Sequence, residues 1–449
     1  MKLKEHFLFP RDLEFDYPLA VKGEGVWVWD EKGKKYLDGC SGANVTGIGH
    51  GIKEIADAMK KQAEKIAYPP PLHFLNRPSL EFAKKLLEKV PDIYTRVMLC
   101  SGGSEAIENA VKIARQYHVY TGNASKYRVI SRWQGFHGNT LGADSISGKT
   151  NRRTISTPML MPVQHIVQAD CYRCAFGLKY PACNTLCAKD LERILVQEGP
   201  EYVACFVTET IVGSAAGGVT PVKEYYPIIR ETCDRYNVPW IADEVMTGVG
   251  RTGTFLAIEQ WEVAPDIVVL AKGLSSGYAP LAAILIRDKI FKGFSETRLP
   301  YIGGHTYNAH PVTSSVGIAV LDYLDKHQLI EGVKEKGRLL EKGLRSIAEE
   351  VSIVGDVRGM GLMWGIEFVK DKETKETFDP SFNLSLRIVR KAQRKGLILY
   401  PVTGCADGML GDGVLICPPL VINEDELTIL LQMLEEVLRE VNVEIGVIK

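Results

Sequence analysis

Three stretches of the 449-residue sequence hold residues that could act together on one ligand, and the first offers an anion site. In CSGGSEAIENAVKIAR, residues 100–115, an apolar strand runs into glycine and serine and then into a helix. Gly102, Gly103 and Ser104 stand where backbone N–H groups, a helix dipole and a hydroxyl would meet a phosphate. A strand-to-helix turn with glycine and serine is also a common helix N-cap, so this stretch alone leaves both interpretations open.

The other two stretches end short apolar strands in charged residues. VPWIADEVMTGVGRTG, residues 238–253, ends its strand in Asp243 and Glu244, where α/β folds place ligands, although such carboxylates can also cap a turn. In PDIVVLAKGLSSGYAPL, residues 265–281, Lys272 follows five apolar residues, and the alternative is a lysine that reaches back to water. Burial would favour the neutral, nucleophilic amine that Schiff-base chemistry needs.

Together these stretches offer a phosphate cradle, an acid for a ring nitrogen and a lysine for an aldehyde. That set is the one required by pyridoxal 5'-phosphate. The segment RWQGFHGNT, residues 132–140, adds Phe136 and His137 beside glycines, so that an aromatic face could approach a flat cofactor ring. Phe136 could equally belong to the ordinary core.

The elements that must position these residues follow an α/β pattern. From residue 51 to 310, helical stretches such as 52–65 and 79–90 alternate with the apolar runs 97–100, 202–207, 239–242 and 267–271. This alternation predicts βαβ units and a mostly parallel sheet covered by helices. Residues 21–38 alternate apolar and polar side chains around a turn and predict a β-hairpin.

The last third of the chain predicts a smaller α+β unit. We expect a long helical stretch at 312–348, a strand over VRGMGLMWGIEF, and helices at 384–395 and 424–441. Residues 51–310 would form a large cofactor-binding domain, and residues 1–50 and 311–449 would together build the small domain. The cleft between the two domains is the expected ligand site.

With these motifs in place, the chain resembles the class III aminotransferases, pyridoxal phosphate enzymes of fold type I, and among them the omega-amino acid and amine:pyruvate subgroup. The resemblance covers nearly the whole chain and implies a seven-stranded, mostly parallel sheet in the large domain. Its motifs are GEGVWVWDEKGKKYLDGCSGANVTGIGHG, SGGSEAIE, FHGNT, ADEVMTGVGRTG, AKGLSSGYAPL, GGHTYNAHP and GDGVLICPPL.

The resemblance implies that Lys272 forms the Schiff base and shuttles the substrate proton, while Asp243 keeps the ring nitrogen protonated. It implies cofactor contacts for seven further positions: Gly103 and Ser104 at the phosphate, Phe136 and Val245 on the two ring faces, His137 and Glu209 along the site, and Thr306 at the phosphate of a neighbouring subunit. A residue that acts across an interface makes the expected enzyme a homodimer or a dimer of dimers. The resemblance assigns no metal ligand.

Two departures from the family pattern bear on the substrate. Many amine:pyruvate members carry tyrosine where Phe136 stands, and many carry an arginine for the substrate carboxylate just before the late GD. Here no arginine lies between Tyr400 and Leu420, so carboxylate recognition would come from elsewhere, for example the segment 68–77, or the donor needs no carboxylate. The resulting hypothesis is an amine or omega-amino acid donor with pyruvate or another 2-oxo acid as acceptor. A racemase, aminomutase or decarboxylase on the same fold is the alternative, because these enzymes begin from the same Schiff base.

Composition agrees with a small-molecule enzyme. With 45% hydrophobic and 24% charged residues, the chain is too apolar for disorder, and its length suggests two or three domains. The 54 basic and 55 acidic residues give a net charge of −1, which favours neither nucleic acid nor a membrane surface as partner. The opening MKLKEHFLFPRDLE lacks a signal-peptide core, and no apolar stretch is long enough to span a bilayer, so the expected location is the cytoplasm. A ligand-sensing regulator would need a DNA-binding domain, for which we find neither a spare segment nor a basic patch.

Four of the ten cysteines form a cluster that the resemblance does not explain. Cys171, Cys174, Cys183 and Cys187 have the spacing C-x2-C-x8-C-x3-C. Three interpretations remain open: structural zinc, a disulfide, or reduced thiols that pack a loop. Cys205 and Cys417 stand in apolar strands and are expected in the core.

Overall fold

A seven-stranded sheet forms the centre of the computed structural model, which describes residues 7–9 and 11–448. The strand order is β4-β10-β9-β8-β7-β5-β6. Their bounds, in that order, are β4 (Tyr94–Cys100), β10 (Ala282–Arg287), β9 (Ile267–Leu270), β8 (Trp240–Asp243), β7 (Val203–Glu209), β5 (Arg128–Arg132) and β6 (Gln164–Ile166). Only β10 is antiparallel to its neighbours β4 and β9, so the other strands all run in one direction. The predicted mostly parallel sheet is confirmed, and the carboxyl ends of its parallel strands share one edge.

Both faces of this sheet are buried, which explains the continuous apolar runs of its strands. Helix α4 (Gly103–Tyr120) packs on β7, β9 and β10, where side chains such as Val207 and Ile241 join its own Ile107 and Ile113 in one core cluster. Phe206, Trp240 and Val268 belong to the cluster on the opposite face. Because successive strand residues point to opposite faces, a strand covered on both sides needs apolar residues at every position.

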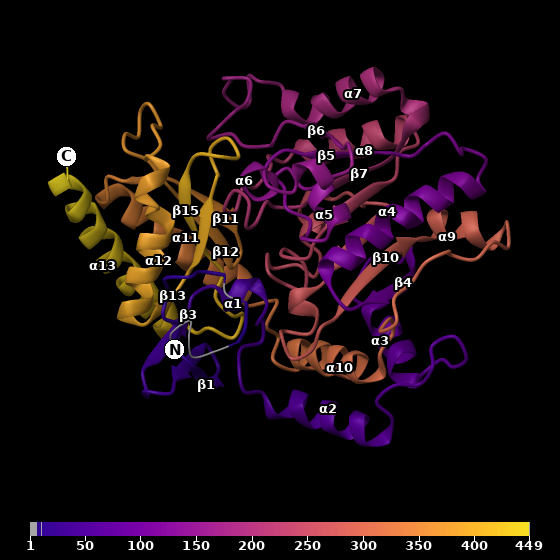
Figure 1. Ribbon diagram of the computed structural model, residues 1–449, viewed down its shortest axis with the longest axis horizontal. Helices are drawn as coiled ribbons and strands as arrows, with labels where there is room; N and C mark the ends of the chain where they lie inside the picture. Colours follow the sequence, from indigo (N-terminus) through magenta and orange to yellow (C-terminus); the bar gives the residue numbers. More distant parts are fainter. Residues whose placement is uncertain (1–6, 10, 449) are drawn as a thin grey trace.

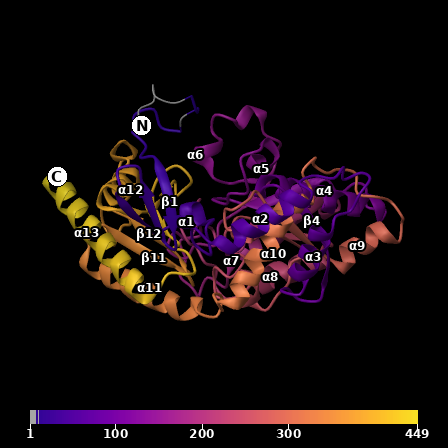
Figure 2. The same cartoon turned by 90° about the horizontal axis from the view of Figure 1, so that it is seen from below.

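Some of the remaining helices pack on strands of this sheet, and others pack on neighbouring helices. α10 packs against α2 and α3, and Figures 1 and 2 show these three helices together along one side of the molecule. The bounds are α1 (Ser41–Asn44), α2 (Lys53–Lys65), α3 (Arg77–Leu87), α5 (Leu141–Ile146), α6 (Thr150–Arg153), α7 (Leu186–Glu198), α8 (Tyr225–Arg235), α9 (Asp288–Ser295) and α10 (Pro311–Lys326). Short 3-10 turns connect them: η2 (Thr157–Met159), η3 (Pro200–Tyr202), η4 (Ala257–Trp261) and η5 (Lys272–Leu274).

Two four-stranded sheets lie beside the large sheet, together with the C-terminal helices (Figure 1). One has the order β1-β2-β3-β13 and the other β11-β12-β15-β14. The bounds are β1 (Ala20–Glu24), β2 (Trp27–Asp30), β3 (Lys35–Asp38), β13 (Leu397–Ile398), β11 (Val354–Met360), β12 (Met363–Phe368), β15 (Asp412–Ile416), β14 (Tyr400–Thr403), α11 (Val333–Glu350), η6 (Pro380–Phe382), α12 (Leu384–Lys395) and α13 (Glu424–Ile448). The predicted hairpin is confirmed as β2–β3, and β3 also pairs with β13 from the far end of the chain. The exact domain boundaries stay a prediction.

Two predictions for the last third were wrong in detail. The helix expected at 312–348 is two helices, because α10 ends at Lys326 and α11 begins at Val333, with Gln328 between them in the left-handed region at φ 46°. The run VRGMGLMWGIEF is not one strand. It belongs to the hairpin β11–β12, which turns at Gly361, where φ is 58° and a Cβ would lie 2.7 Å from the Arg251 carbonyl oxygen. Neither the α10–α11 break nor the β11–β12 turn contains a proline. Gly361 is one of several glycines in the run VRGMGLMWGIEF, so the sequence did not single it out as a turn.

Within the described residues, no helix combines the length and the apolar character that crossing a membrane requires.

Candidate active site

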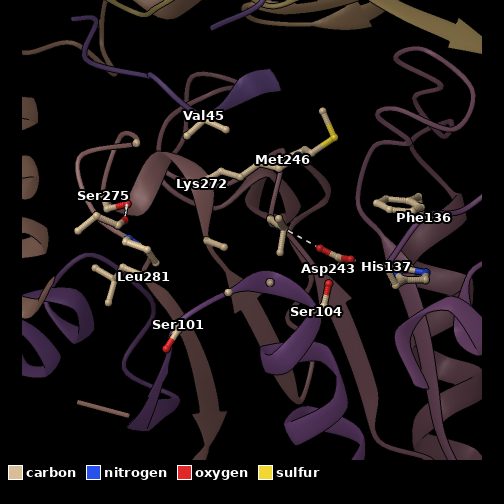
Figure 3. A pocket seen from close by; sticks show the side chains of 18 of the residues that line it. Val45, Ser101, Ser104, Phe136, His137, Asp243, Met246, Lys272, Ser275 and Leu281 are labelled. Atoms are coloured by element: carbon tan, nitrogen blue, oxygen red, sulfur yellow. Dashed lines mark hydrogen bonds and ion pairs between the residues drawn. The ribbon is translucent and has the colours of Figure 1, made fainter. Parts of the chain in front are cut away.

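A cavity of about 420 Å³ lies at the edge of the large sheet where the parallel strands end (Figure 3). Its volume is typical of a site for a cofactor and a small substrate. Eight of the nine predicted site residues line it: Gly103, Ser104, Phe136, His137, Glu209, Asp243, Val245 and Lys272. Thr306, the ninth, does not.

Lys272 follows β9 by two residues and begins the η5 turn. Its backbone is in the left-handed region at φ 43°, and its carbonyl oxygen accepts a hydrogen bond of 3.0 Å from the Ser276 N–H. Burial lowers the pKa of its amine, and the nearby Asp243 carboxylate opposes that shift. A lysine whose neutral form is favoured by burial is suited to attack a carbonyl group.

Asp243 is the last residue of β8, and only 4% of its surface is exposed. Its Oδ1 accepts from the Val245 N–H at 3.0 Å, and its Oδ2 lies 2.8 Å from His137 Nδ1. The other ring nitrogen of His137 lies 3.3 Å from Ser131 Oγ. When His137 donates from Nδ1, this hydrogen bond fixes the orientation of the buried Asp243 carboxylate. The remaining lone pairs of the carboxylate can then accept from a cationic group in the cavity.

Glu209 ends β7 and pairs in register with Asp243. Its carboxylate does not face the cavity as a free group, because Oε2 accepts from the Phe136 N–H at 2.8 Å and Oε1 accepts from the Gly213 N–H at 3.0 Å. Burial raises the pKa of this carboxyl group. Glu209 thereby holds the loop that carries Phe136 at the cavity wall.

The anion site predicted between β4 and α4 stays a prediction, and the local geometry leaves room for it. The first-turn N–H groups of α4 have no acceptors within the helix, and its N-cap residue is Gly102. Ser104 Oγ accepts from the Asn139 N–H at 3.1 Å. Gly138 is in the glycine-favoured region at φ 144°, and a Cβ on it would lie 2.3 Å from Ser104 Oγ. This close approach explains the glycine of the FHGNT motif and leaves the helix N-terminus open to a phosphate.

The adjacent carboxylates Asp243 and Glu244 have different roles, because neighbouring residues at a strand end point in different directions. Glu244 accepts from the N–H groups of Ala257 and Ile258, at 2.6 and 2.7 Å, and from Thr210 Oγ1 at 3.0 Å. Burial raises its pKa to about 7. Glu244 ties the β8 loop to η4 and does not line the cavity.

Thr306 lies in the exposed loop between α9 and α10, and its carbonyl oxygen accepts from the Tyr68 hydroxyl at 2.8 Å. Its side chain is exposed and absent from the lining of the cavity of its own chain. The role predicted for Thr306 across a subunit interface stays a prediction.

Several residues that line the cavity were not predicted from the sequence as site residues. Ser275 follows Lys272 in the motif AKGLSS, and its hydroxyl donates to the Ala279 carbonyl oxygen at 2.5 Å, so the motif itself could have identified it. Val45 comes from the N-terminal segment, and Met246 from the loop after β8. Figure 3 shows both side chains near Lys272. Val45 is distant from Lys272 in sequence, so the tertiary fold brings these two residues together.

The four clustered cysteines line a separate cavity of about 20 Å³, enough for one water-sized group. All four are free thiols, and burial raises the pKa of Cys187 to about 11. Over the described part of the chain, no group of three or more His, Cys, Asp and Glu side chains is arranged to hold a metal ion, so the zinc interpretation gains no geometric support. Cys205 and Cys417 are buried, as predicted.

The residues in the main cavity fit pyridoxal phosphate by their chemistry. An amine with a lowered pKa, a fixed carboxylate and an open helix N-terminus line one space, matching the aldehyde, the ring nitrogen and the phosphate of that cofactor.

Comparisons with known proteins give the same answer. The family model for aminotransferase class-III matches residues 14–438. The uncharacterised aminotransferase YodT of Bacillus subtilis strain 168 is 38% identical over 430 residues, covering 96% of this chain and 97% of the relative. A thermostable (S)-enantioselective omega-transaminase from Thermomicrobium roseum superposes with a TM-score of 0.91 at 34% identity, covering 97% of this chain and 96% of that one.

An amine transaminase from an uncultivated Pseudomonas species, solved with pyridoxal phosphate bound, superposes with a TM-score of 0.90 at 30% identity. That superposition covers 97% of this chain and 98% of the solved one. The large sheet and its flanking helices are therefore those of a fold type I transaminase, and the cofactor is pyridoxal phosphate. The chain belongs to the class-III aminotransferases.

Proposed function

We propose that the protein transfers the amino group of an amine or omega-amino acid to a 2-oxo acid such as pyruvate. The placement of Lys272, Asp243 and the N-terminus of α4 around one cavity is the observation that carries this proposal. The choice of donor is supported by the absence of arginine between Tyr400 and Leu420, since a donor without a carboxylate next to its amine needs no such residue.

The cofactor contacts that we propose follow the geometry of the cavity. Lys272 Nζ would hold the cofactor through its aldehyde group, and the Asp243 carboxylate would stabilise the protonated ring nitrogen. Gly103 and Ser104 would bind the phosphate at the start of α4, and Phe136 and Val245 would contact the ring. When bound there, pyridoxal phosphate supplies a sink for the electron pair left when the substrate carbon loses its proton.

The protein's own groups then carry out acid–base chemistry. The Lys272 amine would serve as the base that removes the proton from the substrate carbon bearing the nitrogen, and burial, which lowers its pKa, favours the neutral form that this role requires. His137 acts through Asp243, because its contact of 2.8 Å orients the carboxylate. Glu209 acts through Phe136 by holding its backbone N–H. The donor leaves as an aldehyde or ketone, and the 2-oxo acid accepts the nitrogen in the second half-reaction.

We also propose that the enzyme is a homodimer in which Thr306 of each subunit reaches the phosphate in the cavity of the other. The loop bearing Thr306 adjoins the segment 68–75 through the Tyr68 hydroxyl, and both expose large apolar side chains. Leu72 is 94% exposed, Leu75 81% and Ile302 72%. A surface of this kind marks an interaction site.

The dimer is tested by Leu75→Glu, which should shift the sedimentation coefficient to that of a monomer and lower activity. Val443→Glu, an equally polar change at an exposed position of α13, is the control and should do neither.

A cytoplasmic location, which we propose as well, is supported by the ten cysteines being free thiols.

A donor and acceptor panel tests the proposed reaction. Purified holoenzyme should convert an aliphatic amine or an omega-amino acid only when pyruvate or another 2-oxo acid is present. Activity confined to α-amino acid donors would contradict the proposed donor class. Turnover of one amino acid with no acceptor at all would instead favour the racemase, aminomutase or decarboxylase alternative.

A further inference from the structure

Arg152, which has no hydrogen bond or ion pair among the described residues, lies beside Phe136, a residue of the cavity wall. Arg152, in α6, places its guanidinium carbon 5.3 Å from the centre of the Phe136 ring, which lines the cavity. This separation is within the range of a cation–π contact. The Arg152 side chain is exposed, and across residues 7–9 and 11–448 its guanidinium has no hydrogen bond or ion pair.

The other arginines near the cavity are already engaged. Arg132 donates to the Glu209 carbonyl oxygen at 2.8 Å, and Arg153 donates to the Ser147 carbonyl oxygen at 2.7 Å. Arg251 is buried, and its guanidinium donates to two backbone carbonyl oxygens. Arg152 differs from these three arginines in being exposed, whereas the two donors that Arg132 leaves unpaired are buried.

The position of α6 connects Arg152 with the loop that lacks an arginine. Asn151 Nδ2 donates to Thr403 Oγ1 at 3.1 Å, and the Asn151 N–H donates to the Gly408 carbonyl oxygen at 2.9 Å. A Cβ on Gly408 would lie 2.7 Å from Thr150 Oγ1. The segment 403–411 and α6 are thus in direct contact, and α6 supplies a guanidinium beside a loop that has none.

A second cation strengthens the positive charge beside Arg152. Lys149, directly before α6, is buried and donates from Nζ to the Ser214 carbonyl oxygen at 2.6 Å. Burial lowers its pKa to about 8, so the amine is largely charged at neutral pH. Asp144, in α5, faces these cations: burial raises its pKa, and the positive charges of Arg153 and Arg152 oppose that shift. An incoming carboxylate on the Phe136 side of the cavity would meet these two cations together with the carboxyl groups of Asp144 and Glu209, and Glu209 already accepts from the Phe136 and Gly213 N–H groups.

We propose that Arg152 binds the carboxylate of the 2-oxo acid acceptor, with the Phe136 ring holding the guanidinium at the cavity. A guanidinium can bind a carboxylate with two parallel hydrogen bonds, which fixes the orientation of the ligand as well as its charge. An amine donor without a carboxylate would make no use of Arg152, so one cavity could accept both substrates. This inference rests on the proposed function, because it assigns a residue to the acceptor of that reaction.

The kinetic test uses the holoenzyme and two acceptors, pyruvate and propanal, with the same amine donor. Arg152→Gln should raise KM for pyruvate about 10- to 100-fold, the loss expected for a charge-assisted hydrogen-bonded pair, and should leave KM for propanal unchanged. Arg152→Lys, which keeps the charge but not the planar fork, should fall between. Arg394→Gln removes a charge from an exposed position on α12 and should match the wild type.

A binding measurement separates this inference from the proposed reaction. Propionate, which lacks the oxo group and cannot react, should bind the wild-type holoenzyme more tightly than propanamide in a calorimetric titration, and Arg152→Gln should remove the difference. Unchanged KM for pyruvate in Arg152→Gln, or an equal rise for propanal, would overturn the assignment of Arg152. A wild-type enzyme that aminates no 2-oxo acid, yet binds propionate through Arg152, would overturn the proposed function and leave the carboxylate site in place.

Discussion

The two sides of the cavity differ in how firmly their charged groups are held. At the strand ends, Asp243 is buried, receives one backbone N–H and lies beside His137, which is itself only 3% exposed. On α6, Arg152 is exposed and contacts the ring of Phe136. The first side offers one fixed geometry and the second an adaptable cation.

This difference suits the two tasks of a transaminase. The groups around the reacting atoms must be in place before the reaction, so that no free energy is spent on reorganising them, and buried hydrogen bonds hold them there. In the reaction that we propose, the amine donor and the 2-oxo acid acceptor differ in charge and shape, and a side chain without fixed partners can bind one of them and not the other. The comparison predicts that substitutions at the strand ends reduce the rate, whereas substitutions at the α6 side change substrate preference.

The largest effect is expected at Lys272. Lys272→Ala removes both the Schiff-base amine and the base, and should lower kcat by at least about 10⁴-fold while the folded protein still binds pyridoxal phosphate. Single-turnover absorbance measurements with an amine donor check the rate, and the cofactor content of the purified variant checks the binding. Lys149→Met, which removes the buried lysine directly before α6, should keep most of kcat with propanal as acceptor.

The second prediction distinguishes the adjacent carboxylates. Asp243→Asn should lower kcat about 10²- to 10³-fold, because a neutral amide no longer stabilises a protonated ring nitrogen. Glu244→Gln is the matched control. It weakens the three hydrogen bonds that the Glu244 carboxylate accepts outside the cavity, and should lower the melting temperature with little change in kcat. Equal loss of kcat in both variants would contradict the separate roles of the two carboxylates.

The third prediction concerns the phosphate end. Gly138→Ala should weaken binding of pyridoxal phosphate about 10- to 100-fold, because its Cβ would displace Ser104 from the start of α4. Titration of the apoenzyme with the cofactor measures the change. Gly177→Ala also puts alanine at a positive φ, 65°, but with no atom within 4 Å, and should bind the cofactor normally. Normal cofactor affinity in Gly138→Ala would show that the cradle does not depend on this close approach.

The smallest effect is a pH dependence on the α6 side. Burial lowers the pKa of Lys149 from 10.5 to about 8, so its positive charge is lost as the pH rises through 8. KM for pyruvate should therefore rise about two- to fivefold between pH 7 and pH 9, while KM for propanal stays constant. In Lys149→Met the ratio of the two KM values should no longer depend on pH over this range. A ratio that changes equally in the variant would assign the titration to another group.

The strand-end residues could be predicted from sequence because each follows a short apolar run, and parallel strands deliver their carboxyl ends to one edge. Asp243 after β8 and Lys272 after β9 are of this kind. Glu244 shares the same signal but points elsewhere, since the direction of a side chain after a strand depends on the loop that follows. The motif therefore identified the position of the carboxylates and not which of them faces the cavity.

Arg152 and Lys149 could not be found in this way. Helix α6 has four residues, too few to show a periodic pattern, and its place beside the cavity depends on contacts with the segment 403–411, distant in sequence. The break between α10 and α11 escaped detection for a related reason, because Gln328 adopts a left-handed conformation without glycine or proline at that residue. The position of α6 and the break at Gln328 both depend on tertiary packing, which local sequence patterns do not report.

The hydrogen bonds from Asn151 to Thr403 and Gly408 also bear on how such an enzyme changes over evolution. Because the segment 403–411 supports the helix that carries Arg152, a substitution in that loop alters the tilt of the guanidinium without touching Lys272 or Asp243. Acceptor preference can thus drift while the reaction itself is conserved. For directed evolution, this loop is the place to randomise first, since variants there sample new acceptors on an intact catalytic centre.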